Sequence, residues 1–129
     1  MTRMKKSYTE TPNFKCWLGD DDVIRSQWTP GTYITYELAK QTVAPVAEFN
    51  KEKQHPLLSD LDGIKGMARE ARVIFSEMDG PSAVALVGGS PIARVIGNMF
   101  IGLNKQTKLP LRMFANEKEA LNWLKDYKR

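Results

Sequence analysis

Histidine and cysteine are almost absent from this chain of 129 residues. Cys16 is its one cysteine and His55 its one histidine. A single cysteine excludes an intramolecular disulfide, and the two residues together are too few for a zinc site with the usual three or four Cys and His ligands. A Ser-His-Asp triad would have to use His55, but nothing beside this residue resembles a nucleophile elbow. These absences argue against zinc and serine-hydrolase chemistry.

Long apolar runs are also missing. No run approaches the length of a membrane-spanning helix, and the first residues, MTRMKKSYTETPN, lack the apolar segment of a signal peptide. We therefore expect a cytoplasmic protein with no membrane span. The chain is long enough for one domain with a real core, and its 42% hydrophobic and 26% charged residues are typical of a globular protein. We expect a flexible arm over residues 1–12 and one domain over residues 13–129.

Dense positive charge is the third absence. The net charge of +4 results from 19 basic and 15 acidic residues. The basic residues gather at the two ends of the chain, at Arg3, Lys5, Lys6, Lys125, Lys128 and Arg129. Nucleic-acid binding surfaces usually combine a basic stripe with interleaved aromatic residues, and this sequence has no such stripe. We therefore expect no nucleic-acid partner.

The most informative stretch is SAVALVGGSPIARVIGNMFIGL, residues 82–103. Its apolar run over residues 82–87 has no polar alternation, which predicts a strand buried on both faces of a parallel sheet. Gly88 and Gly89 then end the strand, Ser90 is suited to cap a helix, and Pro91 to begin it. Apolar residues at helical spacing predict the buried face of this helix: Ile92, Val95, Ile96, Met99, Phe100 and Leu103.

The remaining elements predict an α/β fold. We expect strands over residues 13–18, 23–28, 56–61, 82–87 and 109–114, and helices over residues 36–50, 67–78, 91–103 and from 117 onward. Thr35 and Asn116 are suited to cap the first and last of these helices, and Pro45 should kink or divide the first. The order β-β-α-β-α-β-α-β-α predicts one domain with a mixed sheet of about five strands, in which an N-terminal antiparallel hairpin precedes parallel crossovers.

The fold class indicates where a ligand could bind. Ligands of open α/β sheets gather beyond the carboxyl ends of parallel strands, where we place the loops 62–66 and 88–90. Each loop leads into a helix N-terminus, which attracts anions. Gly88, Gly89 and Ser90 could therefore hold a phosphate or carboxylate near Lys65, Arg69 or Arg94. The simpler interpretation, a turn and a helix cap, is favoured because the loop lacks a P-loop or dinucleotide fingerprint.

Asp60 and Asp62 form a second candidate site. They flank Leu61 at the end of an expected strand, so both carboxylates should point to the same side. Paired carboxylates can do acid–base chemistry or bind magnesium. A carboxylate in this position more often caps the following turn or helix, and we favour that interpretation.

The segment DLDGIKGMAREA at residues 60–71, the SAVALV strand, and the closing PLRMF and EALNWL segments resemble the STAS superfamily. In particular, the chain resembles small bacterial SpoIIAA-like proteins of the STAS/SEC14 type over residues 13–127. In members that act as anti-anti-sigma factors, a partner kinase phosphorylates a serine after the strand end. The matching positions here are Ala68, Arg69, Glu70 and Ala71, which carry no hydroxyl group. The phosphorylation switch is therefore not expected, and Glu70 would at most imitate a permanent negative charge.

The resemblance implies a non-enzymatic regulatory module without cofactor or metal, which docks on a protein partner of the regulatory kinase or sigma-regulator kind. We expect the docking residues to be Asp62, Gly63, Lys65, Arg69, Glu70, Gly88, Gly89, Ser90 and Arg94. A homodimer is a further expectation, with Trp17, Trp28 and Ile101 as candidate contacts. One alternative is a SEC14-like carrier of a lipid or small apolar ligand, which needs an apolar cavity. The other is a metal-assisted enzyme that uses Asp60 or Asp62.

Overall fold

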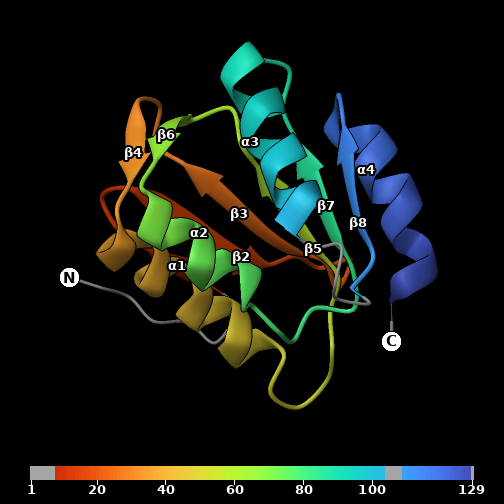
Figure 1. Ribbon diagram of the computed structural model, residues 1–129. Coiled ribbons are helices and arrows are strands. Elements are labelled where there is room, and N and C mark those ends of the chain that lie inside the picture. Colours follow the sequence, from red (N-terminus) through yellow and green to blue (C-terminus); the bar gives the residue numbers. More distant parts are fainter. Residues whose placement is uncertain (1–7, 104–108, 129) are drawn as a thin grey trace.

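The computed structural model describes residues 8–103 and 109–128, and its central element is a six-stranded mixed sheet (Figure 1). The strand order is β1 (Tyr8–Glu10), β2 (Phe14–Leu18), β3 (Ile24–Trp28), β5 (Leu57–Asp60), β7 (Val84–Val87) and β8 (Leu111–Phe114). β1, β2 and β3 pair antiparallel, whereas β3, β5, β7 and β8 pair parallel. The predicted α/β class, the N-terminal hairpin and the parallel crossovers are confirmed.

Helices cover both faces of this sheet (Figure 1). They are α1 (Tyr36–Phe49), α2 (Arg69–Ser76), α3 (Pro91–Leu103) and α4 (Glu117–Leu124), which a 3₁₀ turn, η2 (Lys125–Tyr127), extends. α1, α2 and α3 pack on one face, around Phe14, Ile24 and Leu86, and α4 packs on the other, around Val23 and Ala85. No helix among the described residues is long and apolar enough to cross a bilayer.

Strand β7 is the buried centre that its apolar run predicts. All its residues are buried, with Val84 and Leu86 in the core beneath α1–α3 and Ala85 and Val87 in the core beneath α4. This alternation follows from the two-residue period of a strand, which turns successive side chains to opposite faces. β7 therefore joins the two cores.

Three side-chain caps begin helices at the predicted positions. Thr35 accepts a hydrogen bond from the Leu38 N–H at 3.2 Å, and Asn116 accepts one from the Glu119 N–H at 2.9 Å. Ser90 accepts one from the Ala93 N–H at 3.0 Å. Of the two outcomes expected for Pro45, a kink or a division of the helix, the division does not occur, because α1 is one element from Tyr36 to Phe49.

Two predictions about the strands need correction. The sheet has six strands rather than five, because Tyr8–Glu10, placed in the expected flexible arm, pairs with β2. Residues 1–7 of that arm lie outside the described residues. A second, two-stranded sheet joins β4 (Thr32–Ile34) to β6 (Ile64–Met67), so the following helix begins at Arg69 and not at residue 67.

Cys16 lies in the core with no exposed surface. Burial raises the pKa of its thiol to about 12, because the surrounding apolar side chains disfavour the thiolate. We predict that the native protein does not react with 5,5′-dithiobis(2-nitrobenzoate) at neutral pH and that the denatured protein releases one equivalent of thiolate. The same reaction rate in the native and the denatured protein would contradict this burial.

Candidate functional site

The carboxyl ends of β5 and β7 bring the two predicted loops together. The Asp62 carboxylate accepts hydrogen bonds from the N–H groups of Gly89 at 3.0 Å and Ser90 at 3.1 Å, both at Oδ1. The Asp60 carboxylate in turn accepts one from the Asp62 N–H at 3.0 Å. The loop after β5 is therefore tied to the N-terminus of α3.

The Asp62 carboxylate occupies two of the N–H groups that an anion at the glycine loop would bind. Free N–H groups and the helix dipole attract an anion to the N-terminus of a helix. In this structure Asp62 supplies that negative charge, and Ser90 caps the helix. The geometry therefore agrees with the simpler interpretation of Gly88, Gly89 and Ser90 as a turn and a cap.

The two aspartates also differ in environment. Asp60 is partly buried, and this burial raises the pKa of its carboxyl group. Asp62 is exposed to solvent. No group of three or more His, Cys, Asp and Glu side chains suited to a metal ion occurs within residues 8–103 and 109–128. The hydrogen bonds of Asp60 and Asp62 hold the loop after β5 against the start of α3, and we call this arrangement the loop tie.

Helix α3 buries only part of the predicted face: Ile96 is buried, and Met99 and Phe100 pack partly buried against the core, as expected. Ala93, Ile96 and Gly97 face the sheet, whereas Ile92 is 47% exposed and Val95 is 69% exposed. The reason is a close approach: a Cβ atom at Gly97 would lie 2.5 Å from the Met113 sulfur. Small residues therefore bring the helix against the sheet and turn larger apolar residues outward.

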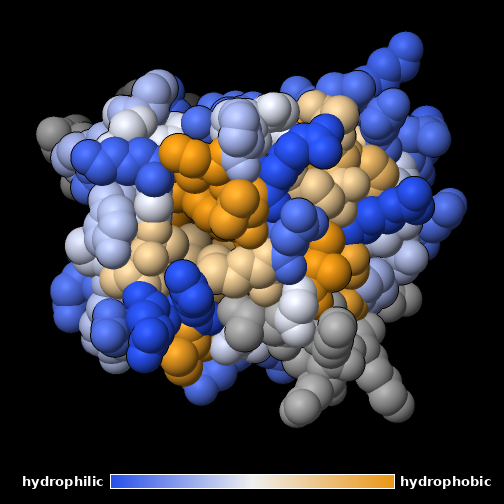
Figure 2. Space-filling view, turned by 45° about the horizontal axis from the view of Figure 1, so that its top comes forward, coloured by the Kyte–Doolittle hydropathy of each residue, from blue (hydrophilic) through white to orange (hydrophobic). Residues whose placement is uncertain are grey.

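These outward residues line a groove between β6, α2 and α3. The groove has a volume of about 350 Å³. Its lining includes Lys65, Met67, Arg72, Ile92, Val95 and Met99, which we call the α2–α3 groove. Figure 2 shows apolar side chains beside hydrophilic ones on this face of the molecule. Lys65 and Arg72 are exposed, and neither forms an ion pair with the residues that the structure describes.

The other predicted docking residues separate into distinct places. Arg69 and Glu70 are exposed in the first turn of α2, whose N-cap, Ala68, makes no side-chain hydrogen bond. Arg94 follows Ile92 by two residues in α3, so it projects from the other side of that helix. Gly63 has a packing role, because a Cβ atom there would overlap the Trp28 carbonyl oxygen.

Two of the candidate subunit contacts also have different surroundings. Trp28 is only 8% exposed and packs between Phe14 and Phe75, so its place in a contact surface is wrong. Ile101 is 36% exposed on α3 and remains available at the surface. The groove residues Met67 and Met99 were missed because a single sequence gives no sign that β6 and α3 are neighbours.

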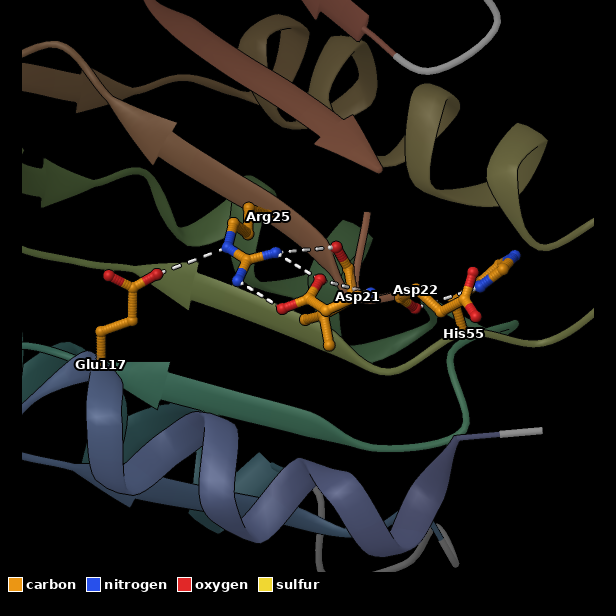
Figure 3. Close-up of polar contacts among 6 residues, drawn as sticks. Asp21, Asp22, Arg25, His55 and Glu117 are labelled. Carbon is orange, nitrogen blue, oxygen red and sulfur yellow. Dashed lines mark hydrogen bonds and ion pairs between the residues drawn. The ribbon is translucent and has the colours of Figure 1, made fainter. Parts of the chain in front are cut away.

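A charged group that sequence reasoning also missed lies on the α4 side of the sheet (Figure 3). Arg25 of β3 binds both carboxylate oxygens of Asp21, at 2.8 and 2.7 Å, and contacts Glu117 of α4 at 3.3 Å. Nearby, His55 Nδ1 lies 3.1 Å from the Asp22 carbonyl oxygen. The Arg25 side chain is 15% exposed, so these contacts join the hairpin turn and the first residue of α4 across a largely buried guanidinium group.

The ion pair predicts an acid-sensitive contribution to stability. The Arg25 guanidinium lowers the pKa of Asp21 from 3.8 to about 2. Because the folded pKa lies below the unfolded one, the contribution is present above about pH 4 and is lost as the pH falls through about 2. We predict that the free energy of unfolding of the Asp21→Asn variant falls less over this window than that of the wild type, measured by urea denaturation. The neighbouring exposed Asp20→Asn should follow the wild type, and equal slopes for both variants would contradict the assignment.

The Asp62 contact gives a second prediction. Asp62→Ala removes the acceptor of two N–H groups at the start of α3, so the free energy of unfolding should fall by about 1–2 kcal/mol. Asp62→Asn keeps an oxygen acceptor and should lose less. Urea denaturation measures both variants. A loss below about 0.5 kcal/mol for Asp62→Ala, the range of surface substitutions without contacts, would show that the tie contributes no stability.

The fold is similar to solved structures. An uncharacterized protein of the DUF3478 family with a SpoIIAA-like fold, from Shewanella loihica PV-4, has 17% identity and a TM-score of 0.63, with 95% of this chain and 99% of that chain covered. The anti-sigma factor antagonist SpoIIAA in its unphosphorylated form has 14% identity and a TM-score of 0.57, with 87% and 97% covered. The fold of this chain is therefore SpoIIAA-like, as the sequence resemblance implies.

A protein of unknown function from Arthrobacter sp. FB24 has 34% identity over 84% of this chain and 90% of that chain, with a TM-score of 0.33. No curated protein matches this chain. The family described as "Domain of unknown function (DUF7793)" matches residues 16–128, which include nearly the whole sheet and all four helices. The chain belongs to this family.

Proposed function

We propose that this protein is a non-enzymatic interaction module that binds an acidic, partly apolar segment of a regulatory protein in the α2–α3 groove. The observation that carries the proposal is the composition of the groove. Exposed apolar side chains of α3, Ile92 and Val95, lie beside the cations Lys65 and Arg72, which have no ion-pair partner in the part of the chain that the structure describes.

The apolar side chains supply affinity. Protein interfaces have an apolar core and a polar rim, and a few aromatic, Arg and apolar anchors carry most of the binding energy. Val95 at 69% and Ile92 at 47% exposed would lose water contact beneath a partner.

The cations supply selectivity. A carboxylate opposite Arg72 can accept two parallel hydrogen bonds from the guanidinium group, and Lys65 adds a second positive charge. Because neither side chain has an ion-pair partner among the described residues, no existing salt bridge has to break on binding. A partner segment with Asp or Glu among apolar residues fits this surface.

The fold relationship supports a protein partner. One of the proteins with this fold is named as an anti-sigma factor antagonist, and its structure is described as the unphosphorylated form. The corresponding N-terminus of α2 in this chain consists of Ala68, Arg69, Glu70 and Ala71. It has no hydroxyl group to phosphorylate, so we propose that partner binding here is constitutive.

The metal-assisted alternative has less support. Asp62 is engaged by the N–H groups of Gly89 and Ser90, and Asp60 accepts the N–H of Asp62. A catalytic role would require these carboxylates to leave the bonds that join the two loops.

Two pairs of variants test the docking proposal. Arg72→Glu and Val95→Asp change the groove, whereas Arg94→Glu and Ile101→Asp make the same changes on the other side of α3. With immobilised protein and an extract of its source cell, we predict a protein that wild type and both control variants retain. Each groove variant should retain at least about tenfold less of it, because like charge and an unpaired buried charge each cost more than 1 kcal/mol.

The captured protein must then bind in purified form with the same variant dependence, measured by calorimetry. Sedimentation of the purified chain alone tests the homodimer, since a dimer that Val95→Asp dissociates would make the chain its own partner and replace this proposal. Equal retention by groove and control variants would place the docking surface elsewhere.

A further inference from the structure

A second, separate space lies inside the molecule, between the sheet and helices α1, α2 and α3. It has a volume of about 80 Å³. Its walls are mainly apolar and include Ile34, Val46, Leu57, Leu61, Val84 and Leu86. The partly exposed Met78, Phe100 and Leu111 also line it, so the cavity extends toward the surface.

The cavity wall contains two hydroxyl groups. Ser26 of β3 and Ser59 of β5 are opposite each other in the parallel pairing, and their hydroxyl oxygens lie 2.9 Å apart. One hydrogen bond between two hydroxyl groups uses one of the two hydrogens. The other hydrogen has no acceptor among the described residues, and an acceptor in the cavity could take it.

Trp28 also lines the cavity, and its indole N–H is a second donor without a partner among the described residues. Trp28 follows Ser26 by two residues in β3, so both side chains lie on the cavity face of the strand. Trp28 Nε1 is buried and has no hydrogen-bond partner among the described residues. A buried N–H without a partner is destabilising, and nearly all such groups in proteins are paired with protein or with a bound molecule.

Aromatic rings hold Trp28 in this position. Its ring centroid lies 5.6 Å from that of Phe14 and 6.4 Å from that of Phe75, and Phe75 lies 5.5 Å from Phe100. The row of rings joins β2, β3, α2 and α3 beside the cavity. It gives a ligand an aromatic surface next to the unpaired donor.

We infer that this cavity binds a small, neutral, mainly apolar molecule with a hydrogen-bond acceptor such as a carbonyl oxygen. The acceptor would take the Trp28 N–H or the free serine hydrogen, and the apolar part would lie against the aliphatic walls. A carboxylate does not fit, because the lining has no cationic side chain to pair with it. A lipid chain does not fit either, because the volume is below the roughly 150 Å³ of a cavity that holds benzene.

This inference is independent of the proposed docking function. It narrows the SEC14-like alternative from a lipid to a molecule of about three or four heavy atoms, because the volume of about 80 Å³ is roughly half of the 150 Å³ cavity that holds the six carbons of benzene. The groove and the cavity have different lining residues apart from Met67, and they bind by different chemistry, so the failure of one proposal leaves the other standing.

Two probes of the same shape test the inference with the unchanged protein. Acetone has a carbonyl oxygen, and isobutene has a CH₂ group in its place. In ¹H–¹⁵N and ¹H–¹³C spectra, we expect saturable shifts of the Trp28 indole N–H and of the Val46 and Leu57 methyl groups with acetone. Isobutene should bind about fivefold more weakly, the difference in affinity that one neutral hydrogen bond makes, and leave the Trp28 N–H signal in place.

Variants identify the site of binding. Ser59→Ala removes one hydroxyl group and should weaken acetone binding without affecting isobutene, whereas Val46→Phe fills the cavity and should abolish the binding of both. The two indoles of Trp17 and Trp123 serve as internal controls whose signals should not move. Absence of saturable shifts at Val46 and Leu57, or equal binding of the two probes, would overturn the inference even if a variant fails to fold.

Discussion

The close contact between helix α3 and the sheet determines most of this architecture. Gly88, Ala93 and Gly97 lie where larger side chains would collide: a Cβ at Gly88 would be 2.5 Å from that of Ala93, and one at Gly97 2.5 Å from the Met113 sulfur. These three small residues form the seam between α3 and the sheet. Because they are small, β7 passes directly into α3 through a short loop. The helix is therefore rotated about its axis so that Ile92 and Val95 lie at the surface.

The close contact between α3 and the sheet also determines where the loop tie and the α2–α3 groove form. With α3 against the sheet, its first N–H groups lie within 3.1 Å of the Asp62 carboxylate, which comes from the neighbouring strand. The bond fixes the loop after β5 and with it the start of β6, which supplies Lys65 and Met67 to the groove. An acidic residue that sequence reasoning placed in a docking site thus positions the surface that we propose as the docking site.

Local signals in the sequence were sufficient for the helices and for the strands β2, β3, β5, β7 and β8, but not for β1, β4 and β6 or for which elements are neighbours. The helix caps Thr35, Ser90 and Asn116 and the buried run of β7 depend on contacts within a few residues, and all of them were predicted. β1, β4 and β6 are each three or four residues long, and what makes them strands is a partner elsewhere in the chain. Periodicity placed Ile96 correctly in the buried face of α3 but wrongly included Ile92 and Val95, because it weights large apolar residues, whereas the close approach to the sheet selects the small residues Ala93 and Gly97.

The groove and the cavity share one side chain, Met67 of β6, which lines both. Methionine is unbranched and adapts its shape to irregular spaces. A molecule in the cavity and a partner in the groove would therefore both contact the same flexible residue. The other residues that carry each proposal belong to one site alone: Val95 and Arg72 line the groove, and Ser59 and Trp28 line the cavity. Energetic coupling between the sites would have to pass through Met67 or through a shift of the helix that forms a wall of both, and α3 is held against the sheet by the seam of small residues.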